Sequence, residues 1–296
     1  MKLSVIVPLY HAYWFDDIVD SYACQDLKKE DYEVIFMVTS NSPDPMICTI
    51  NRVAKINGLN WQAHNVSGES NCKARNLGTK LAKGDIVLFI DGDQLLAPHL
   101  FTKHVEAHFD PTRFPVMFDR YRVGVGICNI NVSRRNNDFD IWMPVRSGQT
   151  MARRINVQGN ARKFVDGMHI SQAIGFADWH NMDDFEDYIN VVGRNVSFDR
   201  GKFIEIGMWD EELAYSETTK SRGWEDLSAG LNAFTNHFTF KMVPSWTVHL
   251  EHPSMAKDGG IDNIVKVVKK YPWFLDRDDW WAIRYNRDEI RRKAGL

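Results

Sequence analysis

Three short, almost wholly apolar runs divide the first third of this 296-residue chain: Leu3–Val7, Glu33–Val38 and Asp85–Ile90. Runs of this length, rich in β-branched and aromatic residues, are typical of strands buried on both faces of a sheet. The stretches between them have helical patterns at Trp14–Cys24, Pro45–Ile56 and Ser70–Ala82, with one more extended segment at Asn60–Asn65. This alternation predicts an α/β fold, in which a mostly parallel sheet is covered by helices.

The alternation of strands and helices stops after Phe109 and returns near the end of the chain. We expect extended structure within Phe114–Ile130, a strand at Asn195–Phe198 and a helix near Glu225–Phe234. Two further strands are predicted near Phe238–Val243 and Trp246–Leu250. The simplest organisation is one domain over residues 1–255 and a helical C-terminal extension over residues 256–296, broken at Pro272.

The charge of the chain is nearly balanced, with 36 Lys and Arg against 39 Asp and Glu. This balance excludes a protein that coats nucleic acid through bulk charge. The charge is unevenly placed, because residues 113–163 hold ten cations and three acids and therefore carry +7, leaving −10 for the rest. This segment is either a solvated loop or a basic lid that meets an anionic donor or acceptor.

The four cysteines form no C-x-x-C pair, and a disulfide scaffold of this length would carry more of them. The apolar run at the N-terminus is short and cut by Pro8, which is typical of a core strand and not of a signal peptide. Further along the chain, no apolar run has the length of a membrane span. We therefore expect a cytoplasmic protein with reduced thiols and no integral membrane association.

The best candidate site is the sequence Asp91-Gly92-Asp93, which directly follows the third apolar run. In open α/β sheets, ligands bind beyond the carboxyl ends of the strands. Two carboxylates on a tight turn suit Mg²⁺ or Mn²⁺ shared with substrate phosphates, and the glycine permits close approach. Taken alone, the tripeptide is equally consistent with a plain Asp-Gly turn.

Three other segments accompany this turn in a fixed order. Ser4–Tyr10 is a strand that ends in a proline turn, Gly68–Gly78 opens a helix, and Gly223–Asp226 opens a later helix with the sequence Gly-Trp-Glu-Asp. Over residues 2–255 these segments resemble the inverting nucleotide-sugar glycosyltransferases of the GT-A fold. The likeness is to family 2 and its galactosyltransferase-like relatives. It implies a Rossmann-like, mixed and mostly parallel sheet.

The resemblance also implies roles on the donor side. Pro8 and Tyr10 would lie under the nucleotide base and ribose, and Arg75, with Asn76 beside it, would reach the base or the diphosphate. Asp91 and Asp93 match the D-x-D motif of these enzymes. Asp93 would bind Mn²⁺ or Mg²⁺ directly, and Asp91, a second candidate ligand, would lie nearer the ribose or sugar.

The Gly-Trp-Glu-Asp segment matches the acidic pair from which these enzymes draw their base. Asp226 would deprotonate the acceptor hydroxyl, Glu225 would position donor or acceptor, and Trp224 could stack on a sugar ring. The alternative is that both acids only stabilise the N-terminus of a helix.

The chain departs from the family after the second strand, where relatives carry an acid that holds the uracil or ribose. Here the sequence is Thr39-Ser-Asn-Ser42, so Ser40 or Asn41 would bind the donor as neutral groups. A UDP-sugar remains the expected donor, with the base left open.

Histidine offers a third metal ligand. His249, or alternatively His252, follows the acidic pair and a strand, and residues three apart on a strand point to opposite faces. His104 and His108 have the four-residue spacing of a zinc helix, but Glu106 does not immediately follow the first histidine. We interpret this second pair as a solvated helix face.

The predicted function is metal-dependent transfer of a hexosyl or N-acetylhexosaminyl group from a nucleotide-sugar to an acceptor hydroxyl, with inversion. The alternatives are a sugar nucleotidyltransferase and a degenerate GT-A domain that binds nucleic acid or glycan. The acceptor is left open among an anionic molecule, such as modified DNA or an acidic glycan, and a protein side chain.

Overall fold

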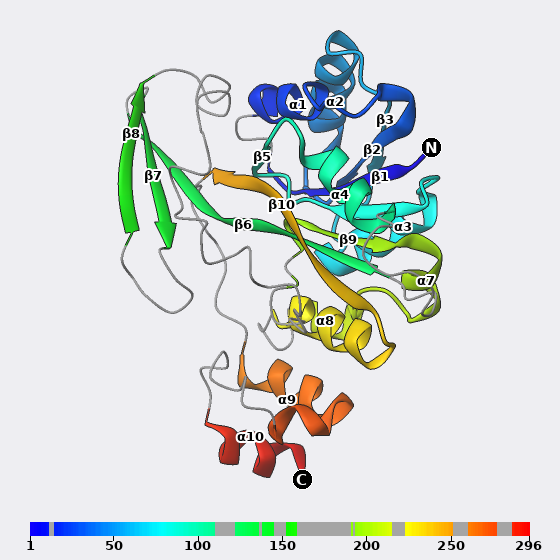
Figure 1. The fold of residues 1–296 in the computed structure, drawn as a ribbon, viewed down its shortest axis with the longest axis vertical. Coiled ribbons are helices and arrows are strands. Elements are labelled where there is room, and N and C mark those ends of the chain that lie inside the picture. The colour runs from blue at the N-terminus through cyan, green and yellow to red at the C-terminus, as the bar shows by residue number, and fades with distance from the viewer. Residues whose placement is uncertain are drawn as a thin grey trace.

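The structure is a computed structural model that describes residues 1–11, 15–109, 122–135, 138–144, 152–158, 191, 193–214, 223–250, 260–276 and 286–296. One mixed sheet runs through the molecule in the order β3-β2-β1-β4-β9-β6-β10-β5 (Figure 1). Helices lie on both of its faces, as the alternation of strands and helices predicted.

The first half of the sheet is parallel. Its strands are β1 (Leu3–Leu9), β2 (Tyr32–Val38), β3 (Trp61–Asn65) and β4 (Ile86–Phe89). β1 lies between β2 and β4, and β2 pairs with β3. The connecting helices are α1 (Phe15–Ala23), α2 (Pro43–Ile56) and α3 (Asn71–Leu81), with a 3-10 turn η1 (Lys29–Asp31). The predicted strands and helices of this region are confirmed within a few residues.

The second half of the sheet is mixed. β9 (Val196–Asp199) runs antiparallel to β4 and to β6 (Arg122–Arg135). β6 runs parallel to β10 (Thr239–Leu250), and β10 pairs with the three-residue β5 (Gln94–Leu96) in antiparallel register. Through β9 and β6, the parallel strands near the N-terminus are joined in one sheet with β10, which ends at Leu250.

The 113–163 segment is more than a loop. It contains β6, β7 (Asp138–Pro144) and β8 (Ala152–Gln158), which pair in an antiparallel meander. Figure 1 shows β7 and β8 to one side of the main sheet, away from α3. The expectation of a basic loop is therefore wrong for the described part of this segment, because its backbone groups pair between strands.

β10 was expected as two strands and is one. Its register against β6 shifts between Val243 and Trp246 and again before Val248. The first shift falls at Pro244-Ser245, where proline has no N–H to give to the ladder, and bulges are where sheets accept proline. The interruption in the sequence pattern marks a bulge and not the end of a strand.

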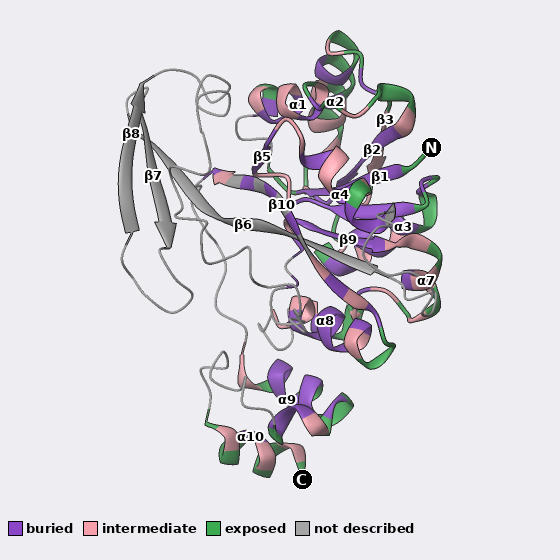
Figure 2. Ribbon diagram, viewed as in Figure 1, coloured by how far each residue is buried: buried purple, intermediate pink, exposed green. Residues whose placement is uncertain are grey.

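Each face of the sheet has its own hydrophobic cluster (Figure 2). Along β1, Val5 and Val7 pack in the cluster with α1, α2 and α4 (Leu100–Phe109), whereas Ile6 packs in the other. That second cluster includes residues of α3, α7 (Arg200–Glu205) and α8 (Glu225–Thr235). The strands are apolar throughout because both of their faces are covered.

The C-terminal extension contains α9 (Ile261–Lys270), the 3-10 turn η5 (Pro272–Asp276) and α10 (Arg287–Ala294), with the predicted break at Pro272. Ile264 and Val268 of α9 belong to the same cluster as Leu227 and Leu231 of α8. The extension and the α/β part thus share a core, while the division at residue 255 stays a prediction.

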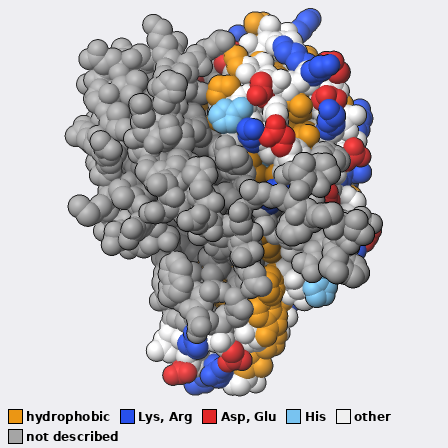
Figure 3. All heavy atoms as spheres, in the orientation of Figure 1, with side chains coloured by type: hydrophobic (Ala, Val, Ile, Leu, Met, Phe, Trp, Pro, Cys, Tyr) orange, Lys and Arg blue, Asp and Glu red, His pale blue; other side chains and the backbone are white. Residues whose placement is uncertain are grey.

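Charges of both signs occur on the described surface. On the face drawn in Figure 3, acidic and basic side chains are interspersed over the described N-terminal part. Cys24, Cys48 and Cys72 are free thiols. Among the helices in the described ranges, none is long and apolar enough to span a bilayer.

The histidine pair of α4 is buried, so the expectation of a solvated face is wrong. His104 is 0% exposed, and its two ring nitrogens lie 2.8 Å from Ser197 Oγ and 2.8 Å from Asn195 Oδ1. His108 Nε2 lies 2.9 Å from the same hydroxyl. The face of α4 that carries both histidines is turned toward β9, where Ser197 supplies the polar partner. Burial lowers the pKa of His104 to about 3 and keeps its ring neutral.

Candidate active site

The carboxyl ends of the parallel strands meet at one edge of the sheet, where the sequence placed the donor site. The Thr39 N–H donates to Leu9 O at the end of β1, and the Val66 N–H donates to Val38 O at the end of β2. Pro8 is buried in β1, and Tyr10 is exposed just beyond it with its ring edge-on to His11.

Ser40 and Asn41 follow β2 at the same edge. Asn41 is exposed, and the Ser40 hydroxyl accepts a hydrogen bond from the Ser42 N–H. The predicted base-binding groups are thus gathered where the end of β2 meets the end of β1.

The Asp91-Gly92-Asp93 turn packs directly against the end of β1. A Cβ on Gly92 would collide with the side chain of Leu9 and would lie 3.0 Å from Pro8 O. The glycine therefore lets the turn that carries the two aspartates approach Pro8 and Leu9 closely.

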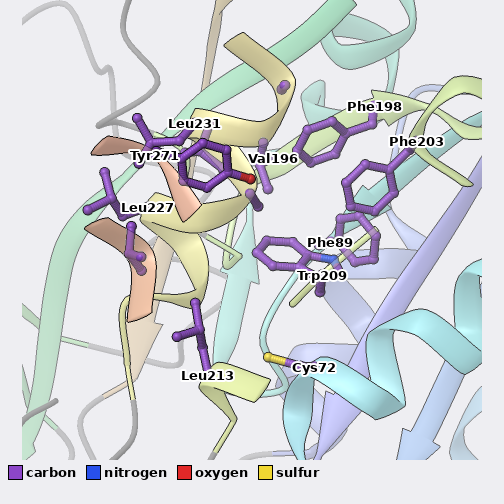
Figure 4. Close-up of a cluster of buried hydrophobic side chains, with 14 of the residues drawn as sticks. Cys72, Phe89, Val196, Phe198, Phe203, Trp209, Leu213, Leu227, Leu231 and Tyr271 are labelled. Carbon is purple, nitrogen blue, oxygen red and sulfur yellow. The ribbon is translucent and has the colours of Figure 1, made fainter. Parts of the chain in front are cut away.

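Arg75 reaches the first aspartate of this turn from α3. Its Nη2 lies 2.7 Å from Asp91 Oδ1, with Arg75 4% exposed and the Asp91 side chain 30% exposed. The guanidinium stacks 4.8 Å from the ring centroid of Trp209, which itself packs edge-on against Phe89 (Figure 4). Burial opposes the charge of Arg75, but the carboxylates of Asp91 and Asp226 outweigh it and raise its pKa. Within the described ranges, Arg75 Nε and Nη1 have no hydrogen-bond partner.

The second aspartate faces β10. Asp93 Oδ2 lies 3.3 Å from His249 Nε2, and Asp93 Oδ1 accepts a hydrogen bond from Gln94 Nε2 over 2.6 Å. The register of β5 against β10 sets this contact, because His249 lies opposite Gln94 and the Leu250 N–H donates to Asp93 O. The alternative ligand, His252, lies outside the described residues.

The donor atoms of Asp93 and His249 suit a divalent cation such as Mn²⁺, since a carboxylate oxygen and an imidazole nitrogen converge. Asp91 is committed to Arg75 through one of its oxygens. In the part of the chain that the structure describes, His, Cys, Asp and Glu form no group of three that could hold a metal. A cation bound here would therefore need further ligands, such as the phosphates of a donor.

The acidic pair begins α8 behind an unusual turn. Gly223 and Trp224 both have left-handed backbone, with φ of 101° and 72°. For tryptophan this conformation costs about 1–2 kcal/mol. Glu225 and Asp226 occupy the first helical turn, where the helix dipole favours negative charge.

Asp226 is partly buried, beside Glu225 and near Arg75. Its Oδ1 accepts a hydrogen bond from the Gly193 N–H over 3.0 Å. Burial and then the charge of Glu225 raise the pKa of Asp226 to about 7, although the Arg75 guanidinium and the Gly193 N–H pull it down. A carboxyl group that ionises near neutral pH is suited to accept a proton.

Gly193 was not anticipated from the sequence. A Cβ on this residue would lie 2.6 Å from Arg75 Cζ, so the missing side chain admits the guanidinium. Gln94 was missed as well, although its place directly after Asp93 was a signal that could have found it. Gly193 has no comparable local signal, because its role arises from a tertiary contact.

Asn76 lies in the core beside Arg75. Its amide bonds to Trp209 through the backbone O and N–H, at 2.9 and 3.0 Å, and to Glu211 Oε1 at 2.8 Å. These bonds tie α3 to the start of η4 (Glu211–Leu213). Its expected contact with the donor stays a prediction.

Comparison with known proteins matches residues 4–109 to the model of the glycosyltransferase like family 2. Over 300 residues the chain is 23% identical to YfnE of Bacillus subtilis, an uncharacterized glycosyltransferase, covering 92% of this chain and 71% of YfnE. A shorter segment of 99 residues is 33% identical to TarS of Staphylococcus aureus, a poly(ribitol-phosphate) β-N-acetylglucosaminyltransferase. That segment covers 32% of this chain and 17% of TarS.

Solved structures share the fold. The S. aureus TarS fragment 1–349 in complex with UDP-GlcNAc aligns with a TM-score of 0.58 at 15% identity, covering 99% of this chain and 70% of the fragment. GalNAc-T7 with UDP, GalNAc and Mn²⁺ aligns with a TM-score of 0.60 at 14% identity, covering this whole chain and 55% of that one. At these identities the likeness establishes the mixed α/β sheet of the GT-A fold.

Proposed function

We propose that this glycosyltransferase transfers a hexosyl or N-acetylhexosaminyl group from a UDP-sugar to an acceptor hydroxyl, with inversion at the anomeric carbon and with a divalent cation. The observation that carries the proposal is the partly buried Asp226, which accepts a hydrogen bond from Gly193, lies near the Arg75–Asp91 pair and has a pKa raised to about 7. This arrangement supports Asp226 as a proton acceptor close to Arg75 as a cationic group on the donor side.

On the donor side, Pro8 and Tyr10 would support the base and ribose, and Ser40 or Asn41 would hydrogen-bond the base. Asp91 would face the ribose or sugar while Arg75 holds its carboxylate. The exposed part of Asp91 supports this assignment, since one of its oxygens is bound to Arg75 and the side chain still reaches solvent. Trp224 would lie against the sugar ring.

Mn²⁺ or Mg²⁺ would be held by Asp93 and His249, with Asp91 as a second candidate carboxylate ligand. The 3.3 Å approach of Asp93 Oδ2 to His249 Nε2 supports this pair as ligands. When bound, the cation supplies positive charge for the diphosphate that leaves the sugar.

On the acceptor side, Asp226 would take the proton of the attacking hydroxyl. The new bond forms between the acceptor oxygen and the anomeric carbon, on the face opposite the departing diphosphate. The old bond from that carbon to the phosphate oxygen breaks, UDP leaves with the electron pair, and the proton remains on Asp226. Glu225 would orient the reactants beside it.

We propose an anionic, hydroxyl-bearing polymer as the acceptor. Support comes from the +7 charge of residues 113–163 and from TarS, whose name gives poly(ribitol-phosphate) as its substrate. The three free thiols among the described residues support a reducing compartment, so we place the reaction in the cytoplasm.

The test is a thermal-shift screen of the full chain against UDP, GDP and their sugars, with and without Mn²⁺. It is followed by transfer assays with poly(ribitol phosphate), glucosylated DNA and a hydroxyl-bearing peptide. Stabilisation by a UDP-sugar that requires the metal, and transfer to the polyol phosphate, are expected. Stabilisation by no nucleotide would contradict the donor site, and transfer only to DNA or peptide would contradict the acceptor.

A further inference from the structure

A single side-chain amide of the C-terminal extension joins two separate parts of the chain beside the acidic pair. Asn263 of α9 is 1% exposed, and its Nδ2 donates to Leu213 O over 3.1 Å and to Gly223 O over 3.3 Å. Leu213 ends η4, and Gly223 directly precedes Trp224. The amide therefore links the two residues that flank the stretch 214–222.

Other residues of α9 hold the η4 side of this link. Lys266 Nζ donates to Glu212 O over 2.9 Å, and Lys270 Nζ lies 3.3 Å from Asp210 Oδ2. Asn76 ties the same region to α3. The η4 side of the link is thus held to the α/β part. Asn263 connects it to Gly223 through its two hydrogen bonds.

The hydrogen bond from Asn263 to Gly223 acts directly before the acidic pair. Gly223 and Trp224 are two consecutive left-handed residues, and α8 begins immediately after them at Glu225. The carbonyl that Asn263 holds belongs to the peptide joining these two residues. Fixing this peptide plane fixes the direction in which Glu225 and Asp226 enter the helix.

We propose that Asn263 is a positioning residue, which holds the Gly223–Trp224 turn so that Asp226 meets Gly193 and faces Arg75. The inference rests on the proposed role of Asp226 as the base. It makes α9 part of the catalytic unit, although α9 contributes no group to the reacting atoms.

The test compares Asn263→Asp with Asn232→Asp in the full chain. Asn263→Asp keeps the shape but turns an acceptor oxygen toward two carbonyls. Asn232 is the matched control. It lies on α8, the helix that begins with the acidic pair, but its Nδ2 donates to the Ile206 carbonyl over 2.7 Å, away from that pair. The measurements are kcat, the Kd for UDP-sugar and the pH profile of kcat.

We expect Asn263→Asp and Asn263→Ala to lower kcat at least tenfold, to move the acid limb of the pH profile, and to keep the donor Kd within twofold. Asn232→Asp should keep kcat within twofold. In the Asp226→Asn background, Asn263→Asp should lower kcat little further, because both changes act on one group.

Two results would overturn the inference. One is an equal kcat for Asn263→Asp and Asn232→Asp. The other is a parallel loss of donor binding and kcat in both Asn263 variants, which would indicate a general structural role. Full activity of Asp226→Asn would instead contradict the proposed base, and the two failures are thus distinguishable.

Discussion

The backbone N–H of Gly193 donates to Asp226 Oδ1, and the α-carbon of the same glycine lies against the Arg75 guanidinium. Two groups that shift the pKa of Asp226 downward therefore depend on one residue without a side chain. Burial and Glu225 work in the other direction, and the balance leaves the pKa of this carboxyl at about 7.

Gly193→Ala is expected to displace Arg75, because the new Cβ would lie 2.6 Å from Cζ. The groups that act on Asp226 are Glu225, Arg75, Asp91 and the Gly193 N–H, and only Arg75 among the side chains lowers its pKa. An opposite charge nearby lowers a carboxyl pKa by about 1–3 units. We therefore expect the acid limb of the pH–kcat profile to move up by roughly 0.5–1 unit.

The matched control for this experiment is Gly201→Ala on α7, where a Cβ would meet no atom within 4 Å. Its profile should coincide with that of the unmodified protein. Identical profiles for the two variants would show that Gly193 does not set the position of the guanidinium.

Asp226→Asn is expected to lower kcat on the order of 10²- to 10⁴-fold, the usual contribution of a general base. Donor affinity should be retained, because the donor groups lie on the strand ends and α3. In the unmodified protein, kcat should fall tenfold per unit as the pH drops below about 7, where Asp226 becomes protonated. Single-turnover kinetics with a UDP-sugar check both points, and undiminished transfer by the variant would exclude this base.

The same substitution is expected to stabilise the fold at alkaline pH. The carboxyl ionises at about 3.9 in an unfolded chain and at about 7 in the folded protein. Between these values the folded state binds the proton more tightly, so stability declines as pH rises through 7. Asp226→Asn should therefore raise Tm at pH 8 and raise it less at pH 5.

Asp262→Asn on the exposed side of α9 is the control for this measurement. Its Tm should differ from that of the unmodified protein by similar amounts at pH 8 and pH 5. A lower Tm for Asp226→Asn at pH 8 would mean that the charged carboxylate is well solvated or paired in the fold.

Asp93→Asn and His249→Asn are each expected to weaken Mn²⁺ binding at least about tenfold, since even outer-shell changes cost 10–100-fold. The reason is the convergence of Asp93 Oδ2 and His249 Nε2. Calorimetric titration with Mn²⁺ and UDP measures the effect. The control is His237→Asn, an exposed histidine in a left-handed turn that asparagine accepts. Unchanged binding in His249→Asn would remove this histidine from the site.

His104 predicts an acid sensitivity of opposite sign to that of Asp226. An unfolded histidine protonates at about 6.5, whereas the folded His104 stays neutral down to about 3. The unfolded state therefore binds more protons as the pH falls, and at pH 5 the loss of stability is about 2 kcal/mol. His104→Gln should have a lower free energy of unfolding at pH 7 than the unmodified protein. On going from pH 7 to pH 5, however, the variant should lose less of that free energy, as measured by urea unfolding. An equal loss in the variant would mean that the ring is protonated in the fold.

The sequence was most informative where a local pattern is sufficient. Buried strands such as β1 have no polar face, and Asp91 and Asp93 follow β4 immediately, so their place at the sheet edge follows from chain order. His249 lies 3.3 Å from Asp93 near the end of a strand that the pattern indicates, while its role as a metal ligand stays a prediction.

The sequence failed where the partner lies on a distant element. His104 looks polar on α4, and only the arrival of Asn195 and Ser197 beneath the helix explains its burial. Gly193 and Asn263 have no local signature at all, because one admits a guanidinium from α3 and the other holds a carbonyl 40 residues upstream.

The pairing of β5 with β10 also governs the order in which the protein can mature during synthesis. Gln94 and His249 lie opposite each other but are more than 150 residues apart in the chain. Strands β1 to β4 can associate as soon as they leave the ribosome, whereas Asp93 acquires its histidine only when β10 has emerged. A nascent chain stalled before residue 239 would therefore contain the strands of the donor site and remain inactive.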